Sequence, residues 1–94
     1  MGNVFEVVDS TSRKIRLTEE QWLHIKQDHP DITMEEIELT LTKPLKIVDK
    51  EGDKAYYYHY FKSRKSAFKY VRSIIKYLNG HGFVITVYPV RNAN

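Results

Sequence analysis

The stretch YVRSIIKYLNGHGFVITVYPV, at residues 70–90, decides the fold of this 94-residue chain. Its centre, Asn-Gly-His-Gly at residues 79–82, is typical of a connector between two antiparallel strands, because these residue types accept positive φ angles. Residues 83–88 are rich in β-branched and aromatic side chains and predict a strand. Residues 68–78 fit a helix or a strand by periodicity, and the connector favours the strand. The sequence therefore predicts an antiparallel strand pair here.

The residues before this pair predict two more strands. Residues 45–48 and 55–62 are apolar or aromatic, and a polar turn around Gly52 separates them. Consecutive strands joined by short connectors usually pair with one another. We therefore expect a four-stranded antiparallel β-meander from residue 45 to residue 88.

The N-terminal half predicts a hairpin and two helices. Residues 4–8 and 13–17 are strand-like on either side of a turn at residues 9–12. Thr18 and Thr33 are each followed three residues later by Gln or Glu, the pattern of a helix N-cap. The helices should end near Pro30 and Pro44, since proline disfavours helix in the residue before it. The predicted fold class is α+β, one domain over residues 1–94: an N-terminal β-hairpin, two helices, then the meander.

Composition excludes several classes of site. The chain has no cysteine, so disulfides, zinc–thiolate sites and cysteine nucleophiles are excluded. No apolar run approaches the roughly 18 residues of a membrane helix, and residues 1–9 do not read as a leader peptide. We therefore expect a cytoplasmic protein without a membrane partner. Neither a phosphate-binding glycine loop nor a zinc-protease histidine pair occurs, so no cofactor and no metal is expected.

Charge is unevenly distributed along the chain. Residues 1–53 hold all 12 acidic residues and 7 basic ones, a net charge of −5, whereas residues 54–94 hold 8 basic residues and no acid, a net charge of +8. All seven tyrosines also lie in the second segment. Such asymmetry indicates a polyanionic partner. The alternative is a solvated basic face that balances the acidic half.

Strand alternation assigns these residues to faces. On residues 70–78, Val71, Ser73 and Ile75 share one face and leave the cations on the other. On the last strand, one set of alternating residues is apolar and the other more polar; the apolar set is Phe83, Ile85 and Val87, and the polar set is Val84, Thr86 and Tyr88. We expect the helices to cover the apolar side and the exposed side to present Arg72, Lys76, Thr86 and Tyr88. A slip of one residue in the pairing would invert this assignment.

Basic and aromatic side chains together suit RNA. Lysine and arginine neutralise phosphates, and tyrosine rings stack on unpaired bases. The candidate nucleic-acid-binding residues are Tyr58, Tyr60, Lys62, Arg64, Lys65 and Lys69. About half of the tyrosines are expected to be structural instead, because tyrosine is also a good strand residue.

Two histidines are candidates for acid–base chemistry. His24 and His29 are five residues apart, which places them about 140° apart around a helix, so they do not form a metal pair. His29 ends the first helix and can point towards the sheet. Histidine ordinarily titrates near neutral pH, which suits proton transfer.

Three motifs resemble those of a known superfamily. LTEEQWLHIKQDHPDI at residues 17–32, YYYHYF at residues 56–61 and the stretch at residues 70–90 resemble the small phage- and toxin-associated nucleases of the barnase–EndoU–colicin–RelE superfamily. The resemblance covers about residues 14–91. It implies N-terminal helices followed by a four-stranded antiparallel sheet. It also implies metal-independent ribonuclease activity, often as a toxin held by an acidic antitoxin protein.

The resemblance also implies residue roles. His29 and His24 would act as acid and base, Lys76 and Arg72 would stabilise the phosphate, Thr86 would hydrogen-bond it, and Tyr88 matches an aromatic of the last strand. Ser73 departs from the pattern, which has an apolar or β-branched residue there.

The leading hypothesis is an endoribonuclease that cleaves RNA by 2′-OH transesterification to a 2′,3′-cyclic phosphate. The alternatives are a non-catalytic RNA- or DNA-binding module, or a protein-interaction domain that uses the same basic face.

Overall fold

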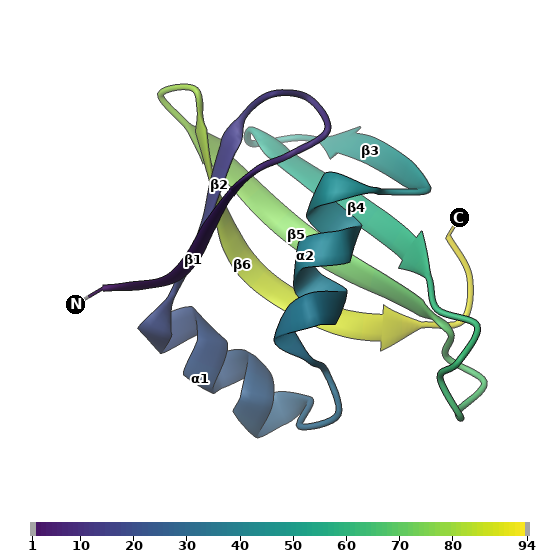
Figure 1. The fold of residues 1–94 in the computed structure, drawn as a ribbon. Coiled ribbons are helices and arrows are strands. Elements are labelled where there is room, and N and C mark those ends of the chain that lie inside the picture. Colours follow the sequence, from purple (N-terminus) through teal and green to yellow (C-terminus); the bar gives the residue numbers. More distant parts are fainter. Residues whose placement is uncertain (1, 94) are drawn as a thin grey trace.

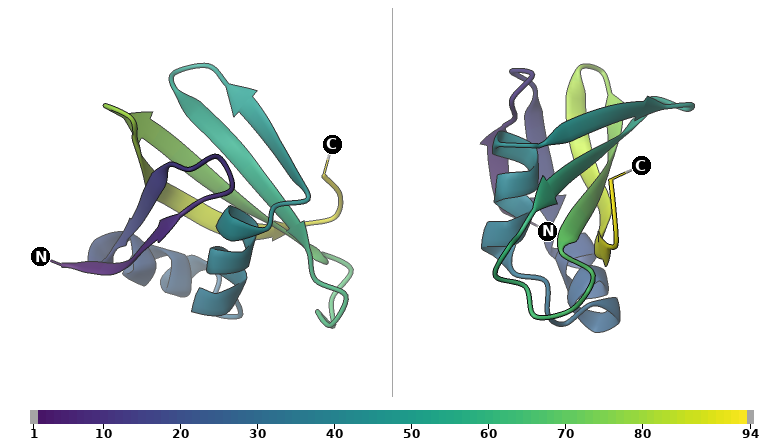
Figure 2. Two further views of the ribbon diagram at one scale, coloured as in Figure 1. Left: turned by 45° about the horizontal axis from the view of Figure 1, so that its top comes forward. Right: turned by 90° about the vertical axis from the view of Figure 1, so that its right-hand side faces the viewer.

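A six-stranded mixed β-sheet forms one layer of the protein, and two helices pack against one of its faces (Figure 1). The computed structural model describes residues 2–93. In the view turned by 90°, α2 lies on one side of β5 and β6, together with the hairpin of β1 and β2 (Figure 2). The predicted α+β class is therefore confirmed. No helix within residues 2–93 has both the length and the apolar character needed to cross a membrane.

The N-terminal hairpin forms one edge of the sheet, and the strands of residues 46–90 form the rest. The elements are, in chain order, β1 (Asn3–Val8), β2 (Lys14–Thr18), α1 (Glu19–Asp28), α2 (Met34–Thr42), β3 (Lys46–Lys50), β4 (Lys54–Tyr60), β5 (Tyr70–Leu78) and β6 (His81–Val90). The strand order across the sheet is β1-β2-β6-β5-β4-β3. The N-terminal hairpin and the strand assignment of residues 70–78 are confirmed.

Both predicted helix starts are confirmed by their caps. The Thr18 hydroxyl accepts a hydrogen bond from the Gln21 backbone at 3.2 Å. Thr33 and Glu36 form a complete capping box, in which each side chain bonds the other residue's backbone N–H. The helices end at Asp28 and Thr42, and their C-cap residues, His29 and Lys43, directly precede Pro30 and Pro44.

The predicted four-stranded meander is present, but it is part of a larger, six-stranded sheet. Strands β3 to β6 pair antiparallel in chain order, as expected, but they do not form a separate sheet. The start of β6 also pairs in parallel with β2, Ile15 opposite Gly82, and this pairing joins the hairpin to the meander. Gly82 permits the junction, because a Cβ there would press on Ile15 and lie only 3.0 Å from Ile75 Cγ2. The pairing joins segments more than sixty residues apart in the sequence, so no local sequence pattern predicts it.

A β-bulge changes which residues of β6 face the core. Ile75 pairs with Val84 and Ile74 pairs with Thr86, which leaves Ile85 as the extra residue. Val84 and Val87 therefore both point into the core. The expectation that Phe83 shares the core face with Val87 is wrong, since the bulge reverses the alternation between them. Thr86 keeps its expected side of the sheet.

A buried hydrogen bond fixes the register between α2 and the sheet. Ser73 and Thr40 are each 0% exposed, and their hydroxyl oxygens lie 2.6 Å apart. Thr40 donates its own proton to the Ile37 carbonyl, so Ser73 donates to Thr40. Ser73 thus sits among the apolar side chains that α2 covers. The neighbouring Arg72 consequently faces away from the helices.

A second buried polar cluster ties the hairpin turn to β4. The Asp9 carboxylate accepts the backbone N–H groups of Thr11 and Arg13, both at 2.9 Å, and the hydroxyl of Tyr57. Tyr57 also hydrogen-bonds the Tyr77 hydroxyl. Burial raises the pKa of Tyr57, and the bond to Asp9 raises it further, so the phenol stays neutral. These two tyrosines are structural, as part of the set was expected to be.

We expect the Ser73–Thr40 pair to be energetically coupled. Thr40→Val strands the Ser73 hydroxyl in the core and should lower the free energy of unfolding by about 1–3 kcal/mol. Ser73→Ala should cost about 1 kcal/mol, and the double variant should cost less than the sum of both. Urea unfolding measures all three.

Thr42→Val is the matched control, because Thr42 also donates to a backbone carbonyl of its own helix, that of Glu38, but has no hydrogen-bond partner on the sheet. Strict additivity of Thr40→Val and Ser73→Ala would contradict the assigned role of the pair.

Candidate functional site

The sheet face opposite the helices is ordered in rows. Pairing across β3, β4, β5 and β6 aligns Lys46, Tyr58, Arg72 and Tyr88 in one row, here called the arginine row. The next row holds Val48, Tyr56, Ile74 and Thr86, here called the middle row. The third row holds Lys50, Lys54, Lys76 and Phe83, here called the lysine row. We call this surface the open face.

The open face is basic across four strands. Five cations of β3–β6 point to it: Lys46, Lys50, Lys54, Arg72 and Lys76. Asp49 is the only acid in these four strands, and by alternation it points to the helix side with Ile47. Six of the 12 acidic residues lie in α1 and α2. The charge asymmetry of the sequence is therefore also an asymmetry between the two layers.

Arg72 lies at the centre of a group of tyrosines. Its Nε donates to the Tyr58 hydroxyl at 2.9 Å and its Nη1 donates to the Tyr88 hydroxyl at 2.8 Å. The rings of Tyr56, Tyr58 and Tyr88 lie 5.2, 5.1 and 5.4 Å from the guanidinium carbon. Burial alone lowers the pKa of Arg72, but the bonds with Tyr88 and Tyr58 outweigh it and raise the pKa above its ordinary value. Arg72 is thus a fixed cation at every working pH.

No carboxylate within residues 2–93 forms an ion pair with Arg72. A tyrosine hydroxyl that accepts from arginine still has its own proton to donate. Arg72 and Tyr88 therefore bring several donors and one positive charge together, and the buried Tyr58 holds Arg72 in place. This arrangement suits a tetrahedral oxyanion such as a phosphate.

His29 lies at the end of the arginine row. It is the C-cap residue of α1, and its ring stacks on Tyr88 with 5.9 Å between centroids and 30° between planes. α1 packs against β6, which brings the end of the helix to the end of this row (Figure 1). His29 is partly buried and partly accessible to solvent. A group able to transfer protons is thus next to the Arg72 cluster.

The structure separates the other predicted catalytic residues. Thr86 lies on the open face in the middle row, one step from Tyr88 on the same side of β6. Lys76 lies four residues along β5 from Arg72, about 13 Å away, and its ammonium group donates to the Gly52 carbonyl. His24 is exposed on the outer side of α1, in a shallow hollow with Glu20 and Leu23.

The two predicted nucleic-acid-binding tyrosines differ in their exposure to solvent. Tyr58 is only 1% exposed, so it orients Arg72 and has no free ring face for a base. Tyr60 is 45% exposed and packs edge-on against Tyr70 at 5.1 Å, beyond the arginine row. Next to them, Lys46 donates to the Ala93 carbonyl at 2.7 Å, which holds the C-terminal segment beside this end of the sheet (Figure 2).

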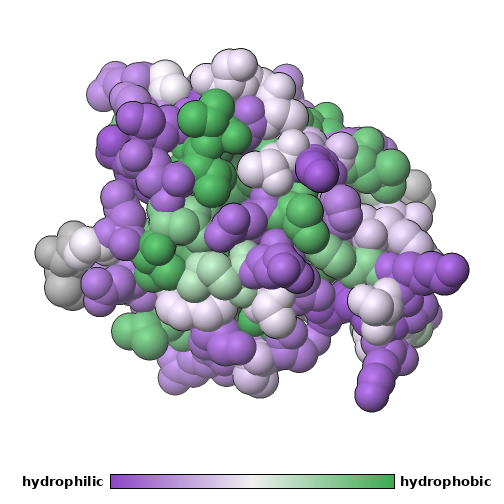
Figure 3. Space-filling view, viewed as in Figure 1, coloured by the Kyte–Doolittle hydropathy of each residue, from purple (hydrophilic) through white to green (hydrophobic). Residues whose placement is uncertain are grey.

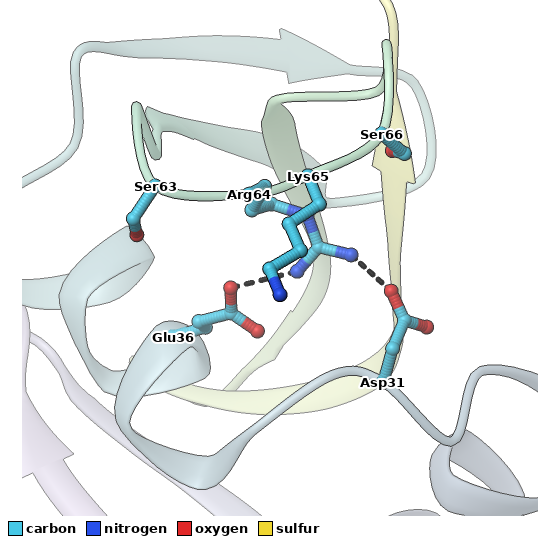
Figure 4. Close-up of a pocket in the computed structure, with 6 residues that line it drawn as sticks. All are labelled: Asp31, Glu36, Ser63, Arg64, Lys65 and Ser66. Carbon is cyan, nitrogen blue, oxygen red and sulfur yellow. Dashed lines mark hydrogen bonds and ion pairs between the residues drawn. The ribbon is translucent and has the colours of Figure 1, made fainter.

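The basic loop between β4 and β5 is partly neutralised. Arg64 forms ion pairs with Asp31 and, at 2.7 Å, with Glu36, and its side chain is 9% exposed (Figure 4). The Lys69 ammonium donates to the Arg64 carbonyl. Lys62 and Lys65 are exposed on this loop, which projects at the lower right of the view and is largely hydrophilic (Figure 3). Arg64 is therefore a structural tether, whereas no ion pair within residues 2–93 holds Lys62 or Lys65.

Sequence reasoning missed three residues of the open face. Lys46 and Lys50 belong to the acidic half, and Lys54 directly follows the turn. The available signal was period two in Lys-Ile-Val-Asp-Lys at residues 46–50, which places both lysines on one face. Their meeting with Arg72 and Lys76 depends on the pairing of three strands, which the composition of one segment does not show.

No family model, curated protein or solved structure matches this chain. Within residues 2–93 there is no cluster of three His, Asp or Glu side chains able to hold a metal ion. The argument for function therefore comes from the geometry of the open face.

We expect Arg64→Gln to act on stability. Two carboxylates, one of them mostly buried, would lose their cation, and the free energy of unfolding should fall by about 1–3 kcal/mol, between the values for exposed and buried ion pairs. Urea unfolding measures the change. Lys65→Gln, the adjacent residue with the same loss of charge, should stay within about 0.5 kcal/mol of the wild type. Equal free energies of unfolding for the two variants would contradict the structural role of Arg64.

Proposed function

We propose that this protein is a metal-independent endoribonuclease whose active site is the His29 end of the arginine row. The observation that carries the proposal is the contact chain from His29 through Tyr88 to Arg72, on a face where strands β3–β6 present no carboxylate. His29 comes from the end of α1, whereas Arg72 and Tyr88 come from β5 and β6. Three groups with complementary chemistry therefore converge from separate parts of the chain.

The chemistry follows from these groups. His29 takes the proton of a ribose 2′-OH, and the 2′ oxygen forms a bond to the adjacent phosphorus. The bond from phosphorus to the 5′ oxygen breaks, and the leaving oxygen takes the Tyr88 hydroxyl proton. Proton transfer from protonated His29 to the tyrosinate then restores both groups. The products are a 2′,3′-cyclic phosphate and a free 5′-OH, with no co-reactant.

Arg72 supplies the charge that this step needs. Negative charge develops on the phosphorane oxygens and then on Tyr88, and Arg72 contacts Tyr88 directly. A cation already held in place by Tyr58 needs no reorganisation when that charge develops. Thr86 lies on the same face, and it would hydrogen-bond the phosphate, the role that the resemblance to the nuclease superfamily implies.

A non-catalytic RNA- or DNA-binding module is the second candidate function. The observation that favours it is that the five cations of the open face do not depend on His29, so binding would survive the loss of proton transfer. The same basic face would also suit an acidic antitoxin protein that covers it. These partners, and the toxin role, belong to the proposal.

We expect cleavage of mixed single-stranded RNA by the purified protein in EDTA, with fragments that end in cyclic phosphate. His29→Ala and Arg72→Gln should each lower the cleavage rate by about 100-fold or more while the circular dichroism spectrum is unchanged. A substrate with one 2′-deoxy position should resist cleavage at that position only.

His24→Ala is the matched control, since it removes an exposed imidazole of the same helix and should leave the rate within about twofold of wild type. Salt-sensitive RNA binding without cleavage would instead identify the binding module. Equal rates for His24→Ala and His29→Ala would contradict the site.

A further inference from the structure

We propose that the lysine row is a second phosphate subsite, so that the ligand is a single strand spanning both rows rather than a short nucleotide. This inference rests on the proposed function, since it assigns a second part of the open face to the same polynucleotide. Nothing in the proposed reaction requires the lysine row, which is remote from His29.

The first observation is an uncompensated row of like charge. Lys54 is directly opposite Lys50 on one side and Lys76 on the other. Like charges directly opposite one another on a sheet destabilise it. No ion pair within residues 2–93 joins a carboxylate to any of the three lysines. A bound phosphate would remove this repulsion.

The second observation is the contrast with the neighbouring hairpin. On β1 and β2, the cations Lys14 and Arg16 also face the open side, but Glu6 pairs with both of them. The hydrogen bond from Arg16 lowers the pKa of Glu6, which keeps the carboxylate ionised. The chain therefore compensates its exposed cations on one side of this face and leaves them uncompensated on β3–β5.

The third observation is the composition of the surface between the two rows. The middle row is uncharged, and its Tyr56 ring lies 5.1 Å from the Lys50 ammonium and 5.2 Å from the Arg72 guanidinium carbon. Tyr56 is only partly buried, and Ile74 and Thr86 continue the row. Phosphates at the two charged rows would place sugars and bases over this uncharged strip.

The separation of the rows sets the length of the ligand. Four residues along β5 separate Arg72 from Lys76, about 13 Å. With a rise of roughly 3.4 Å per nucleotide along one stacked strand, this distance corresponds to about four nucleotides, and to fewer if the strand is extended. A dinucleotide would therefore occupy the arginine row alone, and an octanucleotide would reach both rows.

The test compares 2′-O-methyl RNA oligonucleotides of two and eight nucleotides, which cannot be cleaved by 2′-OH attack. We expect wild-type protein to bind the octanucleotide much more tightly than the dinucleotide at low salt. The double variant Lys50→Gln, Lys54→Gln should lose about tenfold in octanucleotide affinity, with a salt slope smaller by about one, and should bind the dinucleotide as wild type does. Fluorescence anisotropy over a salt series measures these quantities.

The double variant Lys62→Gln, Lys65→Gln is the matched control, with the same charge change on the exposed loop. It should prefer the octanucleotide over the dinucleotide by the same factor as the wild type does. Equal losses of octanucleotide affinity in both double variants would overturn the subsite, because they would show that affinity depends on net charge alone. An unchanged gain from length in Lys50→Gln, Lys54→Gln would overturn it as well. Lysine-dependent binding of an acidic peptide, with no gain for the octanucleotide, would replace RNA by a protein partner and also overturn it.

The outcome is separable from that of the proposed function. Lys50→Gln, Lys54→Gln should still cleave a dinucleotide with a free 2′-OH at the wild-type rate. If cleavage depends on Arg72 but length has no effect, only the lysine subsite fails. If length acts through the lysine row but wild-type protein cleaves nothing, only the nuclease proposal fails.

Discussion

The hydrogen bond between the Ser73 and Thr40 hydroxyls is the constraint on which the rest of the structure depends. Both side chains are fully buried, so each hydroxyl must find its partner inside the protein. A slip of one residue in β5 would break this bond and turn Arg72 into the apolar layer under α2. Burial of an unpaired guanidinium costs several kcal/mol or more, so that register is excluded. Ser73 therefore specifies which side of the strand is basic.

This register gives the two layers different electrostatic characters. The helices hold half of the acidic residues, and the open face of β3–β6 holds five cations and no carboxylate. Within that face, tyrosine hydroxyls rather than carboxylates fix Arg72. A carboxylate in their place would neutralise the cation, whereas a hydroxyl orients it and leaves its charge for a ligand. Structural order and ligand affinity are thus compatible at the same residue.

Much of this architecture was predictable from local patterns. The capping residues Thr18 and Thr33, the two prolines and the connector at residues 79–82 predicted the helices and the strand pair because each acts on its own neighbours. The face shared by Arg72, Thr86 and Tyr88 followed from alternation. The parallel pairing of β2 with β6, the bulge at Ile85 and the reversed position of Phe83 did not, because they depend on contacts between distant segments.

The residues of the candidate site likewise divide into those that local sequence patterns predicted and those that they did not. His29 was placed near the sheet from the proline that ends α1, and its contact with Tyr88 agrees with that expectation. Arg64 was assigned to the ligand by its charge, yet two carboxylates from Asp31 and Glu36 engage it. The lysine row was not foreseen, because Lys50 and Lys54 flank a turn in a segment rich in acids. Net charge along the sequence indicated the kind of partner but not which cations remain free.

Chemical-shift mapping tests the central claim, that the open face binds the polyanion, most directly. Titration of isotopically labelled protein with an uncleavable 2′-O-methyl RNA octanucleotide should shift the Arg72 Nε–H signal and the amides of β4, β5 and the second half of β6. The outer surface of α1 and residues 61–69 should shift much less. Shifts concentrated on the helices or on that loop, with Arg72 unaffected, would contradict the account.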